Sequence, residues 1–292
     1  MRRAGISVLL ALLAGCSKQA AVPPAAPAPP GPPAAPAPPE PPLPPLGEVR
    51  FRDWAEVEED TFLKLPDPAP APDLKWNFSP GRRVGYDFSE TLNQRIERRA
   101  GDRAGSYTSH EKNRGAFEFA AGRDRTALAM MKIQTVEAFV NDRRVPQDPE
   151  KRTQGSVSEC AVSEDGAVDP VKQKGLADVR LYLEALFSVR LGTRELTPGR
   201  ITTKLAGYYK VGRYECARLE SEFELAAEKP SERHLIRGRV VGFFAPAERK
   251  FVRASAAVAS STRANALGKD AVWSTSLMDA VSHFRAKLIE GP

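Results

Sequence analysis

The sequence predicts a mainly β (α+β) fold, in which an antiparallel curved sheet or half-barrel carries one or two helices. Three observations predict it. From about residue 74 to the end, apolar residues mostly alternate with polar ones, which is the period of a half-buried strand. Turn-like clusters rich in Gly, Asp and Pro separate these runs. Only one internal stretch has the three- and four-residue spacing of an amphipathic helix.

The first long strand shows the alternation most clearly. Val84, Tyr86 and Phe88 alternate with polar or small residues, and the pattern continues to Ile96. The same criterion, with turns such as Glu164-Asp165-Gly166, gives the remaining strands. The predicted strands span residues 83–98, 116–120, 128–140, 154–162, 201–209, 214–226, 234–244 and 251–261.

Residues 174–189 are predicted to form the helix. Leu176, Val179, Leu183, Leu186 and Phe187 recur there at helical steps, and Pro170 and Gly192 are suitable boundaries. The end of the chain is ambiguous. Leu277, Val281, Phe284 and Leu288 have helical spacing, but after a series of strands a final strand from Val272 fits equally well.

The N-terminus has the features of a secretory signal peptide over residues 1–15, with a cationic start and a short apolar stretch. That stretch is the longest apolar run, and it is too short to span a membrane. The sequence Leu13-Ala14-Gly15-Cys16 resembles the lipobox of bacterial lipoproteins. The resemblance implies several acyl chains on Cys16 and a stable anchor, and Ser17 after it implies the outer membrane, on the periplasmic face. Exposure at the cell surface stays open, and the alternative is an ordinary cleaved signal with a chance cysteine.

Residues 16–48 are predicted to be a tether. They contain 14 prolines between Pro23 and Pro45, and proline excludes both helix and sheet. Extended polyproline II over the Pro/Ala-rich part would reach about 80 Å from the membrane. Residues 49–73 are predicted to be an acidic and Pro-rich extended segment, and residues 74–292 the β-rich globular domain.

Two cysteines remain besides Cys16. Cys160 and Cys216 fall in predicted strands, and an oxidising periplasm favours a disulfide between them. Two buried free thiols are the alternative. No Cys-x-x-Cys spacing indicates a redox site.

The sequence contains no P-loop, no GxGxxG and no Gly-x-Ser-x-Gly. His110, His234 and His283 are far apart and have no metal-ligand spacing, so no metal site and no cofactor is predicted. Glu220, Glu222 and Glu224 share one face of a strand and are the candidates for an envelope-polymer hydrolase, although a solvated edge has the same pattern. Two groups of arginines suit anionic lipids or simply a solvated face: Arg95, Arg98, Arg99 and Arg103, and Arg233, Arg237 and Arg239.

The long strands, the central helix and the closing hairpin of residues 237–254 loosely resemble uncharacterised periplasmic lipoproteins of LolA/LolB-like half-barrel outline. The resemblance implies a curved sheet whose concave apolar face holds an acyl chain or a partner peptide. We therefore expect a non-enzymatic binding module for a hydrophobic ligand or an envelope protein, with the membrane as partner through Cys16 and no nucleic acid. An assembly factor of an envelope or secretion complex and a hydrolase are the alternatives, so enzymatic activity stays open.

Overall fold

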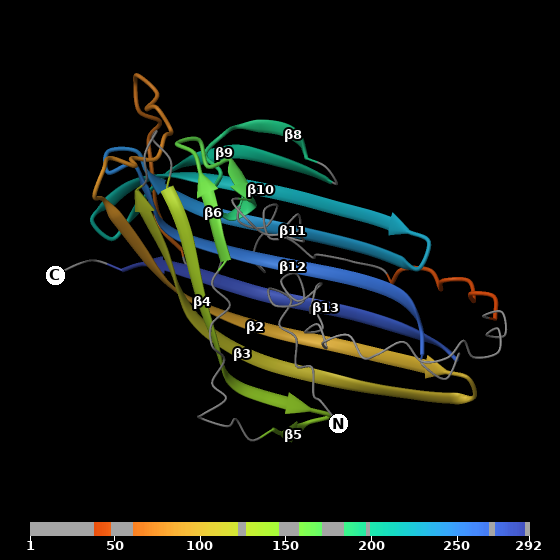
Figure 1. The fold of residues 1–292 in the computed structure, drawn as a ribbon. Coiled ribbons are helices and arrows are strands. Elements are labelled where there is room, and N and C mark those ends of the chain that lie inside the picture. Colours follow the sequence, from red (N-terminus) through yellow and green to blue (C-terminus); the bar gives the residue numbers. More distant parts are fainter. Residues whose placement is uncertain are drawn as a thin grey trace, which may run out of the picture.

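The computed structural model describes residues 38–47, 61–121, 127–145, 158–170, 184–196, 199–268 and 272–289. Within these residues, thirteen strands form one antiparallel sheet (Figure 1). The strands are β1 (Leu63–Leu65), β2 (Arg83–Ala100), β3 (Arg103–Ala121), β4 (Ala127–Val140), β5 (Arg143–Arg144), β6 (Ser158–Val162), β7 (Val168–Pro170), β8 (Gly192–Leu196), β9 (Gly199–Val211), β10 (Tyr214–Lys229), β11 (Glu232–Ala245), β12 (Lys250–Leu267) and β13 (Trp273–Leu288). The predicted mainly β fold is confirmed.

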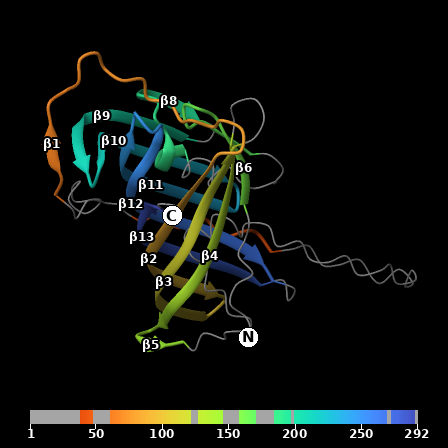
Figure 2. The same ribbon diagram turned by 90° about the vertical axis from the view of Figure 1, so that its left-hand side faces the viewer.

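Two up-and-down meanders make up most of the sheet. One consists of β2, β3 and β4, and the other runs from β9 to β13. They join because the last strand pairs with the first long one, in a register that runs from Ser274 opposite Ala100 to Leu288 opposite Tyr86. Seen from the side, the joined meanders curve into an open trough (Figure 2).

The sheet has two faces of different character, because successive side chains of a strand point to opposite sides. On β2 the even-numbered residues from Val84 to Ile96 are buried, and most of the odd-numbered ones are exposed. We call the buried side the inner face and the other side the outer face. The register places Phe284 of β13 on the inner face and His283 on the outer face.

An aromatic cluster closes one end of the inner face. Trp76 is fully buried, and its ring lies 5.1 Å from that of Phe119, 5.5 Å from that of Phe251 and 6.1 Å from that of Phe187. Its indole N–H donates a hydrogen bond of 3.0 Å to the carbonyl oxygen of Phe187. Its backbone N–H donates to the carbonyl oxygen of Glu164 at 2.7 Å. Trp76 therefore fixes the turn between β6 and β7 and the segment at Phe187 onto the sheet.

Strand β3 is much longer than the predicted strand of residues 116–120. It begins at Arg103, immediately after a two-residue turn in which Gly101 has a positive φ of 55°. The residues from Arg103 to Gly115 are polar or small on both faces, so they show no apolar alternation. Complete pairing with β2, from Ala100 opposite Arg103 onward, holds them in the sheet.

The ambiguous C-terminal segment is a strand, β13, and the helical interpretation of it was wrong. A step of four residues keeps side chains on one face of a helix, but it is also an even number and does the same in a strand. Leu277 and Val281 accordingly lie on the outer face, whereas Phe284 and Leu288 lie on the inner face.

The predicted helix of residues 174–189 is described only in its last part. Residues 184–187 are helical, and the backbone N–H of Ser188 donates to the carbonyl oxygen of Glu184 at 2.8 Å. The helix thus ends two residues before the predicted end, and residues 174–183 lie outside the described residues. Among the helical residues that the structure describes, none forms a helix of the length and apolar character needed to cross a membrane.

The C-terminal part of the predicted tether contacts the domain. Its last described part, residues 38–47, lies against β12 and β13 and hydrogen-bonds to them. Strand β1, which falls in the predicted extended segment of residues 49–73, pairs with β9. Phe62 packs edge-on against Phe243 with ring centroids 4.9 Å apart. The sheet thus takes in residues N-terminal to the predicted boundary at residue 74.

Candidate functional site: the inner face and an outer groove

The inner face between β10 and β2 is an extended apolar surface. Its buried side chains come from strands that are neighbours in the sheet and include Leu219, Phe223, Ile236, Val240, Val258, Phe284, Phe88 and Leu92. Small residues lie among them. A Cβ on Gly238 would lie 2.1 Å from the ring of Phe223, and one on Gly242 would lie 2.5 Å from the ring of Phe251. The two glycines therefore let these aromatic rings lie directly over β11.

A polar cluster interrupts this apolar surface part-way along β2. Glu90 is 2% exposed and accepts hydrogen bonds from Asn113 Nδ2 at 2.8 Å and from Ser282 Oγ at 2.7 Å. Glu111 is also buried, and burial, followed by the negative charge of Glu90, raises its pKa. The inner face thus combines apolar side chains with a cluster of buried, hydrogen-bonded polar groups.

The raised pKa of Glu111 has a consequence for stability. A carboxyl whose pKa is higher in the folded state stabilises the fold fully below its unfolded pKa, and that contribution is lost as pH rises. We therefore expect Glu111→Gln to raise the unfolding temperature at pH 7, with a gain that disappears toward pH 4. Thermal unfolding at a series of pH values measures it.

Glu137→Gln is the matched control, because Glu137 lies on the neighbouring strand and its pKa shifts in the opposite direction. The hydrogen bond from Lys112 lowers the pKa of Glu137, so its contribution is present at neutral pH and is lost in acid. Glu137→Gln should therefore lower stability at pH 7 rather than raise it. An effect of Glu111→Gln that does not change with pH would contradict a raised pKa of Glu111.

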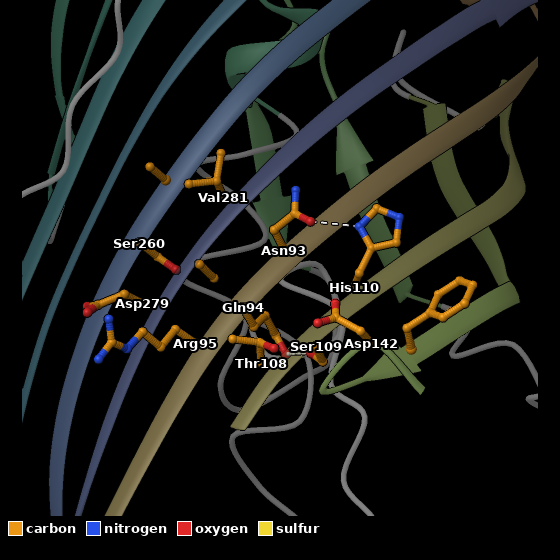
Figure 3. A pocket seen from close by; sticks show the side chains of 13 residues that line it. Asn93, Gln94, Arg95, Thr108, Ser109, His110, Asp142, Ser260, Asp279 and Val281 are labelled. Atoms are coloured by element: carbon orange, nitrogen blue, oxygen red, sulfur yellow. Dashed lines mark hydrogen bonds between the residues drawn. The ribbon is translucent and has the colours of Figure 1, made fainter. Parts of the chain in front are cut away.

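A groove of about 630 Å³ lies on the outer face, across β12, β13, β2 and β3 (Figure 3). His110 and Asn93 lie at its centre, and His110 Nδ1–H donates to Asn93 Oδ1 at 2.7 Å. Asp279 lines it together with Arg95. Although partial burial raises the pKa of Asp279, hydrogen bonds from Arg263 and Ser261 and the charges of Arg263 and Arg95 lower it overall. The groove is lined by both polar and apolar side chains, Phe139 and Val281 among the latter.

The three glutamates predicted as hydrolase candidates lie on the outer face of β10, each beside an arginine. Glu220 lies 2.8 Å from Arg218, Glu222 lies 3.3 Å from Arg239, and Glu224 lies 2.7 Å from Arg237. Glu222 and Glu224 pair across strands with arginines of β11, whereas Glu220 pairs with Arg218 of its own strand. Cross-strand ion pairs stabilise a sheet face. The carboxylates therefore form part of a charged ladder, and two of the predicted basic residues are their partners.

Most of the other predicted basic residues also lie beside carboxylates. Arg233 contacts Glu228 at 2.6 Å, and Arg95 and Arg99 contact Glu97 at 2.9 and 3.8 Å. These contacts agree with the solvated-face interpretation of both arginine groups. Arg98 belongs to the same end of β2, where the side chains are largely exposed.

The three histidines are not brought together. His110 and His283 lie on the outer face with β2 between their strands, and His234 lies on the inner face of β11. Among the described residues, no group of three or more His, Cys, Asp or Glu side chains could hold a metal ion. The structure thus places each histidine in a separate environment.

Cys216 is a free, fully buried thiol on β10. Burial, followed by the negative charge of Glu248, raises the pKa of this thiol to about 12. The side chain of Cys160 lies outside the described residues, so the predicted disulfide stays a prediction.

The chemistry of Cys216 gives a direct test. The thiolate is the reactive form, so a buried thiol with a raised pKa is inert. We expect Cys216 in the native protein not to react with Ellman's reagent at pH 8, and to react once urea unfolds the chain without reductant. An unfolded chain that yields a thiol only after reduction would instead establish the disulfide, and Cys216→Ser is the control that identifies the signal.

Comparisons with known proteins give only distant likenesses. No family model matches the chain, and no curated protein matches it. A structure described as lipid-protein interactions in lipovitellin aligns at a TM-score of 0.42 and 11% identity, over 74% of this chain and 26% of lipovitellin. This chain therefore spans about a quarter of that protein's length. A DUF1329 family protein from Desulfovibrio piger aligns at a TM-score of 0.16 and 11% identity, over 67% of this chain and 83% of its own. Likenesses this weak carry no functional argument.

Proposed function

We propose that this protein is a lipoprotein of the bacterial outer membrane, anchored on the periplasmic face through Cys16, whose β-rich domain binds a hydrophobic ligand without catalysing a reaction. The observation that carries the binding role is the apolar inner face of the curved open sheet. The signal-like residues 1–15 and the Leu-Ala-Gly-Cys sequence support the anchor.

The inner face has the chemistry that an acyl chain with a polar end requires. Apolar side chains such as Val258 and Phe284 are fully buried on this face, so an acyl chain would take the place of the groups that cover them. Each methylene group gains about 0.8 kcal/mol when it is buried. The polar cluster at Glu90 and Asn113 supplies hydrogen-bonding groups on the same face. Ligand pockets in proteins combine these two features, a mostly apolar lining and a few placed polar groups.

The test measures lipid binding by the full chain. Native mass spectrometry of protein purified from bacterial cells reports bound lipid, and titration with the fluorescent fatty acid cis-parinaric acid reports affinity. We expect bound lipid and saturable titration. Ala256→Met, which adds bulk beside Phe284 on the inner face, should weaken the titration at least tenfold. Val281→Met on the exposed outer face is the matched control and should leave it unchanged.

A thermal unfolding curve for each variant shows that the sheet is intact. Absence of lipid, together with no titration by the unmodified chain, would overturn the binding role. Stoichiometric co-purification of one envelope protein without lipid would support the assembly alternative instead.

The anchor has its own test, which does not depend on the ligand. Cys16→Ser should abolish incorporation of labelled palmitate and move the protein from the membrane fraction to the soluble periplasmic fraction. Unchanged membrane association of Cys16→Ser would contradict the lipoprotein assignment while leaving the binding role standing.

A further inference from the structure

The proline-rich residues 38–47, which we call the strap, lie along the outer face of β12 (Figure 1, red-orange). Three side chains donate hydrogen bonds to carbonyl oxygens of strap prolines. Trp273 Nε1 donates to Pro38 at 2.9 Å, Asn265 Nδ2 to Pro41 at 2.7 Å and Arg263 Nε to Pro45 at 3.0 Å. Donation to proline carbonyls, with an indole among the donors, suits a polyproline II helix, because its backbone carbonyls have no internal partners.

Two strap residues fix the register of an otherwise repetitive segment. The Glu40 carboxylate accepts hydrogen bonds from Ser231 Oγ at 3.0 Å and from Asn265 Nδ2 at 3.1 Å. The Gly47 backbone N–H donates to Ser261 Oγ at 2.8 Å. A Cβ on Gly47 would lie 2.8 Å from Asp279 Oδ1, so a larger residue does not fit at this position without movement.

The donors on the sheet are oriented by neighbours that do not belong to the strap. Thr275 Oγ1 donates to Asn265 Oδ1 at 2.8 Å, which turns the amide NH₂ group toward the strap. Asp279 accepts a hydrogen bond from Arg263 Nη1 at 2.9 Å. This contact orients the guanidinium group so that Arg263 Nε donates to the Pro45 carbonyl oxygen. The site is therefore built by β12 and β13 themselves.

From these contacts we infer that the outer face of β12 and β13 is a binding site for a polyproline II peptide, and that its occupant is the strap of the same chain. The inference is independent of the proposed ligand on the inner face. An open hollow of about 730 Å³ separates part of the strap from the β10–β11 turn at Lys229 and Pro230. Polar contacts with β12, with β13 and with Ser231 of the β10–β11 turn hold the strap. The strap exchanges between a bound and a released state.

Strap binding changes the reach of the tether. With residues 38–47 bound, about 16 proline- and alanine-rich residues remain before the sheet, or roughly 50 Å of extended chain at ~3.1 Å per residue. When the strap is released, the tether gains the remaining ~30 Å of extended chain. Binding of the strap is therefore a length control on the tether, and it holds one face of the sheet toward the N-terminal segment.

The experiment opens the site and refills it in trans. A full chain in which residues 38–47 are replaced by Gly and Ser has an empty site, and a fluorescein-labelled peptide of residues 36–48 is the probe in an anisotropy titration. We expect saturable binding to this strap-replaced chain and at least tenfold weaker binding to the unmodified chain, because a tethered competitor has an effective concentration in the mM range.

Point variants in the strap-replaced chain locate the site. Trp273→Phe removes one donor and should weaken peptide binding about fivefold, the effect of one net hydrogen bond. Asn265→Ala removes the hydrogen bonds to both Pro41 and Glu40 and should weaken binding more. Ser274→Ala is the matched control, because Ser274 is next to Trp273 but lies on the opposite face of β13, where its hydroxyl donates to the Ala266 carbonyl oxygen. It should leave binding unchanged. Thermal unfolding checks that each variant folds.

A second measurement uses a chain whose sheet is unaltered. Gly47→Ala in the otherwise native protein should accelerate hydrogen exchange of the Trp273 indole N–H, as seen by NMR, because the strap is displaced. Equal peptide binding to the strap-replaced and unmodified chains, or binding that is insensitive to Trp273→Phe and Asn265→Ala, would overturn the inference. So would a folded strap-replaced chain that does not bind the peptide.

Discussion

Trp76→Ala should lower the free energy of unfolding by about 3–5 kcal/mol, the usual cost of removing a large aromatic side chain from a core. The ring is fully buried among Phe78, Phe119, Phe244 and other rings, so its loss leaves a cavity that the rigid sheet cannot close. The hydrogen bond to the Phe187 carbonyl is lost as well. Urea unfolding followed by circular dichroism measures the change.

Trp76→Phe separates the two contributions, because it keeps an aromatic ring but removes the indole N–H. It should cost clearly less than Trp76→Ala. Val281→Ala, on the exposed outer face, is the surface control and should change stability by no more than about 0.5 kcal/mol. A Trp76→Ala variant as stable as this control would show that the cluster does not hold the end of the sheet closed.

Arg194→Met should destabilise the fold by about 3–5 kcal/mol, because it removes a cation that pairs with a buried carboxylate. Glu184 is 1% exposed, and its Oε1 accepts a hydrogen bond from Arg194 Nη1. Arg194 Nη2 also donates to Ser188 Oγ at 2.7 Å. These contacts tie the end of the short helix to β8, so unfolding curves of the variant should shift to lower urea concentration.

The double variant Arg194→Met/Glu184→Gln should recover part of the loss, because a neutral amide costs less to bury than a carboxylate that has lost this ion pair. Arg83→Met is the exposed counterpart. Its ion pair with Glu118 has side chains 73% and 38% exposed, and such pairs contribute little. If Arg194→Met and Arg83→Met had equal effects, the buried pair would not be a structural tie.

The strands that the sequence predicted well are those with one apolar and one polar face. Val84, Tyr86 and Phe88 alternate because β2 packs only one face against the core, and period-two patterns record that burial directly. The first half of β3 carries polar side chains on both faces, so its place in the sheet follows from pairing with β2, a nonlocal property. In the same way, the four-residue steps of β13 fit both a helix and a strand until its neighbours are known.

The candidate sites were less predictable, because each is assembled from strands that are distant in sequence. Glu90 and Ser282 are 192 residues apart, and no local motif joins them. Trp273, Asn265 and Arg263 were not singled out from the sequence, although Trp273 is one of only three tryptophans and lies beside the last hairpin turn. Composition predicts only a spacer for the prolines of residues 38–47, because it reports backbone stiffness but not what the backbone contacts.

The seam between β13 and β2 has a consequence for how the protein forms. During synthesis β2 leaves the ribosome long before β13, so the edge of β2 that faces β13 waits unpaired until the last long strand is made. Pairings between such distant segments are slow to form. Closure of the sheet is therefore a late step, and until then two partial sheets expose hydrogen-bonding edges that attract other chains. A chaperone that shields unpaired edges would act on this protein in that interval.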